Sequence, residues 1–222
     1  MDSLSLISFF IAPALMVFMA LLSFKMMDKA TYKAYLSSYF LGILTVIPMI
    51  LALIVADHMN LIHERSIRRI ILFSFFLVGF FAEFSKFLLM RFYFLPKDII
   101  SKPADGILYM INISLGFVTA ANIYFSFFWS DLLNVHAVNF TLPFANLLFA
   151  VIMGFFLGMT KFRTNFVDSY TGLGAAIFFQ GLYNFCLLSK DYLLLGIVAL
   201  GTLIIVVILS SKAINTDLDS IE

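Results

Sequence analysis

Long apolar segments follow one another along almost the whole chain, separated by short polar connectors. Each is close to the ~20 residues that a helix needs to cross the ~30 Å hydrocarbon core of a bilayer. The segments are apolar on all faces rather than alternating, which favours helices over the strands of a membrane barrel. The expected spans are 3–24, 35–56, 67–92, 106–129, 143–162, 170–188 and 191–209. The pattern therefore predicts an all-α, polytopic transmembrane helix bundle of about seven spans.

Prolines and the polar tail refine this outline. Pro13 and Pro48 fall inside predicted spans, where a residue without a backbone N–H kinks a helix. Pro143 is expected to open the fifth span, since proline is well tolerated in the first turn of a helix. Residues 212–222 lose the apolar character and gain acidic residues, which predicts a short cytoplasmic tail after a single transmembrane domain at 1–211.

Composition and charge agree with a membrane protein. Hydrophobic residues make up 63% of the 222 positions and charged residues 12%, against about 25% charged in soluble domains. The net charge of +1 gives no extended basic surface, so a nucleic-acid partner is not expected. Cys186, the single cysteine, cannot form an intramolecular disulfide and is expected to be a buried, inert thiol.

The basic residues predict the orientation of the bundle, because cytoplasmic loops hold the excess of Lys and Arg. Nine lie on one side, namely Lys25, Lys29, Lys33, Arg91, Lys97, Lys102, Lys161, Arg163 and Lys212. Four lie on the other side, namely Arg65, Arg68, Arg69 and Lys190. The N-terminus is therefore expected outside and the C-terminus in the cytoplasm, as in an integral protein of the bacterial cytoplasmic membrane.

Four predicted spans contain polar residues that a lipid-facing helix would not tolerate. They lie in the stretches Ala82-Glu83-Phe84-Ser85-Lys86, Ala121-Asn122, Phe144-Ala145-Asn146 and Gln180-Gly181-Leu182-Tyr183-Asn184. Glu83 and Lys86 are three residues apart, so they share a helix face and can neutralise each other inside the bundle. Counting helix rise from the cytoplasmic ends places all four stretches in one band of the membrane. The pattern predicts either an interior functional site or an internal structural pairing.

Four ordered motifs between about 79 and 185 resemble the PrsW-type intramembrane metalloproteases, distant relatives of the CAAX-prenyl-protease and bacteriocin-processing membrane proteins. The motifs are Glu83-Phe84-Ser85-Lys86, then Asp105-Gly106-Ile107-Leu108-Tyr109 with Gly116-Phe117 and Asn122, then Leu147-Leu148-Phe149 through Gly154 to Gly158-Met159-Thr160-Lys161-Phe162, and finally Gly181-Leu182-Tyr183-Asn184-Phe185. The resemblance implies metal-dependent hydrolysis of membrane-protein substrates within the bilayer.

The chain departs from the family pattern at all four positions presumed to hold the metal. Ala82 and Ala121 stand where the family has glutamates, and Asn146 and Gln180 stand where it has histidines. The resemblance leaves a residual catalytic site of Glu83, Lys86, Asn122 and Asn184. The exchanges are those that deliberate inactivation would use, and the intact flanks favour that origin over a natural pseudoprotease.

The donor chemistry predicts that this sequence neither holds a catalytic metal nor hydrolyses peptides. Alanine offers no ligand, and neutral amide oxygens bind zinc poorly. The histidines, His58, His63 and His136, are expected in connectors on the outer side, away from the site. An active relative is expected to use zinc or another divalent metal.

Two other functions stay open at this stage. A non-enzymatic, regulatory membrane protein would use the same interior to bind a transmembrane partner without chemistry. A transporter would use Glu83 as a proton relay. Both alternatives share the lipid bilayer as surroundings, and only the protease hypothesis requires a transmembrane peptide or membrane protein as substrate.

Overall fold

The structure is a computed structural model that describes residues 3–24, 27–59, 66–100, 102–128, 135–163 and 166–219. Within these ranges every regular element is helical. In chain order the elements are α1 (Ser3–Phe24), α2 (Lys29–Leu44), α3 (Ile47–His58), α4 (Ile67–Ile71), the π-helix η1 (Leu72–Phe80), α5 (Phe81–Leu89), the π-helix η2 (Met90–Phe94), α6 (Pro103–Phe128), α7 (Val135–Arg163), α8 (Phe166–Ser189) and α9 (Tyr192–Asp219).

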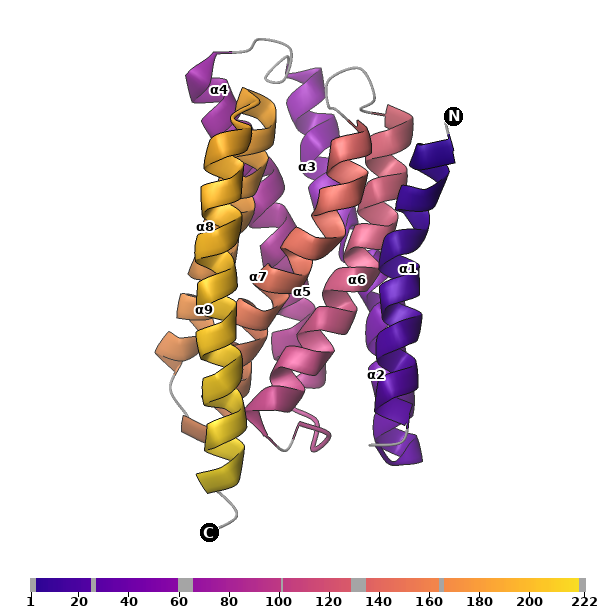
Figure 1. Cartoon of the computed structure of the whole chain (residues 1–222), viewed down its shortest axis with the longest axis vertical. Helices are drawn as coiled ribbons and strands as arrows, with labels where there is room; N and C mark the ends of the chain where they lie inside the picture. The colour runs from indigo at the N-terminus through magenta and orange to yellow at the C-terminus, as the bar shows by residue number, and fades with distance from the viewer. Residues whose placement is uncertain are drawn as a thin grey trace.

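The lengths and hydropathy of these helices confirm the predicted transmembrane bundle. In the described part of the chain, six helical stretches are long and apolar enough to cross a membrane, and α1 contributes a shorter apolar stretch at Phe9–Phe24. The six stretches are Lys29–His58, Ile67–Phe94, Pro103–Phe128, Ala137–Lys161, Val167–Ser189 and Tyr192–Thr216. The two ends of the chain lie at opposite ends of the bundle (Figure 1), and α1 runs alongside the six longer stretches.

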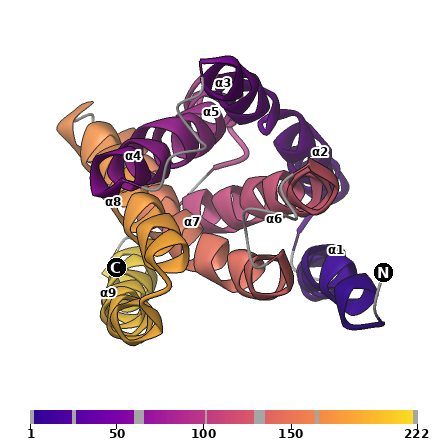
Figure 2. The same ribbon diagram turned by 90° about the horizontal axis from the view of Figure 1, so that it is seen from above.

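Helices α6 and α7 form the centre of the bundle, and α9 lies at its edge (Figure 2). Of an apolar 18-residue segment of α6, 78% is buried inside the protein, whereas only 6% of the corresponding segment of α9 is buried. The view from above places α1 and α2 on one side of this centre, and α8 and α9 on another. Polar side chains that must avoid lipid are therefore best accommodated on α6, α7 and the helices that face them.

The second predicted span is a broken helix rather than a kinked one. Helix α2 ends at Leu44, α3 starts at Ile47, and Pro48 lies in the first turn of α3. Leu44 is four residues before Pro48, so its carbonyl lacks the N–H that would continue the helix. The Thr45 hydroxyl donates to the carbonyl of Gly42 at 2.6 Å, which closes the last turn of α2.

Helix α2 also begins six residues before the predicted span, because Asp28 caps it. The Asp28 carboxylate accepts hydrogen bonds from the backbone N–H groups of Ala30 and Thr31 at 3.0 and 3.5 Å. Such a cap satisfies donors that have no partner within the first turn. Hydrogen bonding from Thr31 and Ala30 lowers the pKa of the Asp28 carboxyl.

The start of the fifth span was predicted wrongly. Helix α7 begins at Val135, and Pro143 lies inside it rather than opening it. His136 consequently belongs to the first turn of a helix and not to a connector, while His58 is the exposed last residue of α3. His63 lies outside the described residues. At the other end of the chain, the predicted tail continues α9 as helix as far as Asp219.

Glycines allow the central helices to approach one another closely. Gly154 and Gly158 of α7 face α6, since a Cβ added at either position would lie 2.7 Å from a backbone carbonyl oxygen of α6. Gly116 of α6 faces the backbone of Tyr39 and Ile43 in α2 in the same way. Without a hydrophobic force between helices in lipid, such close contact supplies much of the association energy.

Gly116→Ala should destabilise the bundle by about 1–3 kcal/mol, because the new Cβ meets backbone rather than a side chain that can move. It would lie 2.9 Å from the amide nitrogen of Ile43. Gly201→Ala is the matched control, since nothing lies within 4 Å of a Cβ at that position in α9. Unfolding of both variants in detergent measures the difference, and equal stabilities would contradict the packing role.

Candidate functional site

A buried polar network joins α5, α7 and α8 at the centre of the bundle. The Lys86 ammonium donates to Glu83 Oε1 at 2.7 Å and to Asn146 Oδ1 at 2.8 Å. Asn146 Nδ2 in turn lies 3.4 Å from Gln180 Oε1, a long hydrogen bond. None of the four side chains is more than 1% exposed. The sequence prediction that Glu83 and Lys86 can pair is matched by their ion pair, and two of the four presumed metal positions lie beside it.

The network is electrically neutral and enclosed by apolar groups. Glu83 and Lys86 carry opposite charges, and the ammonium lies 4.8 Å from the centre of the Phe117 ring, a distance at which a cation is attracted to an aromatic face. Glu83 Oε2 is buried and has no hydrogen-bond partner among the described residues. A carboxylate held this way depends on Lys86 for its charge compensation.

The other predicted site residues form no hydrogen bond with Glu83 or Lys86 in the structure. Ala82 and Ala121 are fully buried in the main apolar core. Asn184 is half-buried, and its amide donates to the carbonyl of Gln180 at 2.9 Å, one turn back along α8. Of the predicted residual catalytic set, the structure brings together Glu83 and Lys86 and leaves Asn122 and Asn184 outside their hydrogen-bond network.

Asn122 has a structural role that follows from the position of Pro143. Because proline has no N–H, the carbonyl of Asn139, four residues earlier in α7, loses its helical donor. The Asn122 amide of α6 donates to that same carbonyl at 3.1 Å. The Asn139 amide then donates to the Ser126 hydroxyl of α6 at 2.6 Å. These bonds fix α7 to α6 about two turns before Asn146 and so help to position it.

Two further residues secure the helices of the network and were not singled out from the sequence. The Ser85 hydroxyl donates to the Thr45 carbonyl at 2.6 Å, which ties α5 to the break between α2 and α3. The Tyr183 hydroxyl lies 2.7 Å from Thr141 Oγ1 and links α8 to α7. The sequence contained an indication of both, since Ser85 and Tyr183 each lie inside one of the four motifs and on the same helix as a residue of the polar network.

The residues at this site do not fit a catalytic metal. Among the described residues, no three His, Cys, Asp or Glu side chains gather closely enough to hold a metal ion. The donors that meet here are one carboxylate, two neutral amides and an ammonium, and the ammonium repels a cation. A hydrolytic zinc site needs imidazole or carboxylate ligands and an open position for water.

The fold and the buried network define a polytopic membrane protein with an enclosed polar centre. The sequence model of a protein family, described as PrsW family intramembrane metalloprotease, matches residues 30–211. The chain therefore belongs to the PrsW family of intramembrane metalloproteases. The match is longer than the resemblance recognised at 79–185, and it includes α2 and α3.

Three curated relatives, each named Protease PrsW, cover most of the chain. The relative from Oceanobacillus iheyensis is 31% identical over 83% of this chain and 83% of its own length. The relative from Geobacillus kaustophilus is 30% identical over 84% and 81%, and that from Shouchella clausii 26% over 86% and 87%. No solved structure matches the chain. Together with the membrane-spanning helices, these bacterial relatives identify an integral bacterial membrane protein.

Asn122→Ala should destabilise the protein by about 1–3 kcal/mol, because it leaves the buried Asn139 carbonyl without a donor. In a Pro143→Ala background the restored N–H can serve that carbonyl, so the same change should cost less. A double-mutant cycle on unfolding free energies measures the coupling, expected near 1 kcal/mol. Additive effects of the two changes would show that Asn122 does not compensate for Pro143.

Lys86→Met should cost about 3–5 kcal/mol, because it leaves the Glu83 carboxylate buried without a counter-charge. Adding Glu83→Gln should recover part of the loss by removing that charge. Lys33→Met, at an exposed position of α2, is the control and should change stability by no more than about 0.5 kcal/mol. If the double variant were no more stable than Lys86→Met alone, the ion pair would not be the source of the loss.

Proposed function

We propose that this chain is an intramembrane protease scaffold that does not hydrolyse peptide bonds as its sequence stands. The observation that supports this most directly is the donor set: Ala82 and Ala121 lie in the apolar core and offer no ligand, and Asn146 and Gln180 offer neutral amides. The family relationship supports the scaffold, and the donor set supports the loss of chemistry.

The charge of the site supports the same proposal. With Glu83 and Lys86 ionised, the network sums to zero without any bound ion. The family resemblance places glutamates at positions 82 and 121, and two carboxylates would supply the two negative charges that balance a divalent metal. Both carboxylates are absent here, so a metal entering this interior would bring an uncompensated double charge into a medium of low dielectric.

The substrate class proposed for the scaffold is a transmembrane peptide or membrane protein. Its interior lies within helices that cross the bilayer, and the network residues are buried from water. A divalent metal such as zinc would supply the hydrolytic chemistry in an active relative. In this chain the retained function is the ability to receive a membrane-embedded partner, which the same fold offers with or without hydrolysis.

Restoring the four presumed ligands should restore metal binding. The variant combines Ala82→Glu, Ala121→Glu, Asn146→His and Gln180→His, and elemental mass spectrometry of the purified protein should find about one divalent metal per chain. The original sequence should contain none. A variant carrying only Asn146→His and Gln180→His is the control for charge, and it should hold much less metal because the two carboxylates are missing.

The outcomes of this experiment separate the hypotheses. Metal only in the fully restored protein supports a disabled metalloprotease. Metal in neither protein would contradict the assignment of the four positions and favour a partner-binding membrane protein. Metal in both would show that the site lies elsewhere in the chain.

A further inference from the structure

Two lysines from separate segments come together at one end of the bundle, where the connector between η2 and α6 lies (Figure 1). The Lys161 ammonium, at the end of α7, donates to the backbone carbonyl of Lys97 in this connector at 2.8 Å. The Lys97 ammonium lies 3.5 Å from the centre of the Tyr93 ring and 5.2 Å from that of Phe94. At such distances a cation is attracted to an aromatic face. These contacts hold both side chains at one place, which we call the Lys97–Lys161 corner.

The corner lies where the hydrocarbon of the bilayer meets the headgroups. Lys161 is the last residue of one membrane-spanning stretch, and Lys97 lies three residues beyond the end of another, at Phe94. Phe92 and Tyr93 are 71% and 47% exposed beside it, and aromatic residues are enriched at this level of a membrane. A ligand that reaches the corner from the bilayer therefore meets apolar surface first and ammonium groups at the edge.

The positive charge of the corner is not balanced by the protein. Neither ammonium forms an ion pair with a described residue. Asp98, the residue after Lys97, is exposed and forms no such pair either. An ammonium has three N–H donors, and a single carbonyl or aromatic face leaves donors over. Two cations side by side at a boundary of reduced dielectric favour an anion that both can bind.

We propose that the Lys97–Lys161 corner binds the phosphate headgroup of an anionic phospholipid from the leaflet at this end of the bundle. The two ammonium groups bind the phosphate, and the acyl chains lie along the exposed ring of Phe92. A headgroup without net charge is disfavoured, because its own ammonium neutralises the phosphate. This inference goes beyond the proposed function and does not depend on whether the interior holds a metal.

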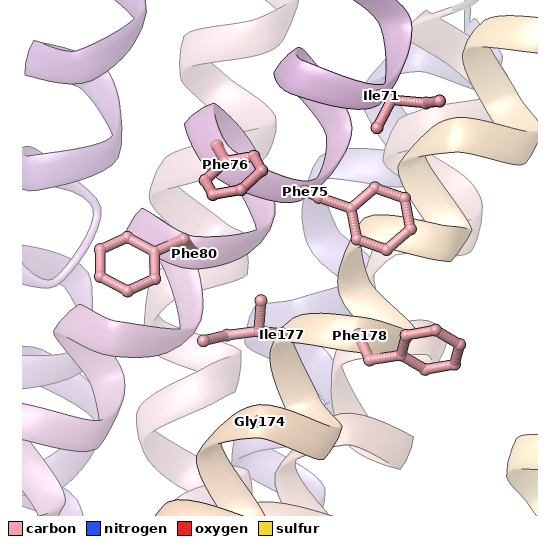
Figure 3. Close-up of a pocket in the computed structure, with 7 residues that line it drawn as sticks. All are labelled: Ile71, Phe75, Phe76, Phe80, Gly174, Ile177 and Phe178. Atoms are coloured by element: carbon pink, nitrogen blue, oxygen red, sulfur yellow. The ribbon is translucent and has the colours of Figure 1, made fainter. Parts of the chain in front are cut away.

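The lipid-facing surface elsewhere lacks these features. The surface between η1 and α8, drawn in Figure 3, is lined by seven residues without a polar side chain, so it cannot distinguish one headgroup from another. Lys33 of α2 and Lys212 of α9 are exposed, and their ammonium groups form no hydrogen bond or ion pair with a described residue. Both lie on the side predicted to be cytoplasmic, so they provide controls for charge alone.

The test is the binding of phosphatidylglycerol to the full chain in detergent micelles, followed by native mass spectrometry. Phosphatidylcholine with the same acyl chains is the reference, since its headgroup has no net charge. We expect one phosphatidylglycerol to bind about 25-fold more tightly than phosphatidylcholine, about fivefold for each lysine. Lys97→Met and Lys161→Met should each lower this ratio about fivefold, and the double variant should abolish the preference.

Two further variants serve as controls. Lys33→Met combined with Lys212→Met removes the same charge from the same side and should leave the ratio unchanged. Lys161→Arg keeps a cation and a donor at the end of α7 and should retain the preference. Lys97→Met keeps the test decisive if Lys161→Met does not fold, because the Lys97 ammonium contacts only aromatic rings.

Three results would overturn the proposal. The first is equal binding of the two lipids by the original sequence, and the second is a preference that Lys97→Met leaves unchanged. The third is complete displacement of phosphatidylglycerol by soluble glycerol phosphate, which would show a site for free phosphate rather than lipid. Because the assay needs no metal, its failure is distinct from failure of the metal-restoration experiment.

Discussion

The ion pair between Glu83 and Lys86 is the interaction on which the centre of this protein depends. A charge inside a bilayer-spanning bundle is costly unless it is paired and hydrogen-bonded. Here the pair is fully buried, and the ammonium also bonds Asn146 on another helix. This requirement determines which face of α5 turns inward. Asn146 of α7 supplies the amide oxygen that completes the hydrogen bonding of the ammonium.

The helices around the pair are held by a second constraint, the need to satisfy backbone groups away from water. Two prolines each remove a donor, and the fold responds differently to each. At Pro48 the chain breaks, and Thr45 and Ser85 supply hydrogen bonds at the break. At Pro143 the helix continues, because Asn122 of α6 serves the carbonyl left without a donor. In both places a hydrogen bond also joins neighbouring helices, from Ser85 to the Thr45 carbonyl and from Asn122 to the Asn139 carbonyl.

These responses mark the boundary of what the sequence could predict. Hydropathy and length were sufficient to find the spans, and the spacing of Glu83 and Lys86 was sufficient to pair them, because both signals are local. Pro143 was placed at a helix start because its compensating donor, Asn122, is distant in sequence. Asn122 and Asn184 were likewise grouped with the site from motif position, whereas the amide of each donates to a backbone carbonyl, that of Asn122 on a neighbouring helix and that of Asn184 one turn back in its own helix.

The amide at position 146 contributes more than the absence of a ligand. Its oxygen accepts a hydrogen bond from Lys86, while its nitrogen donates to the carbonyl of Leu142 and lies near Gln180. A neutral imidazole has one acceptor and one donor, and a metal would occupy that acceptor. Lys86 would then lose one partner and face a cation. Asn146 therefore joins the ion pair of α5 to α7 and, through Gln180, to α8.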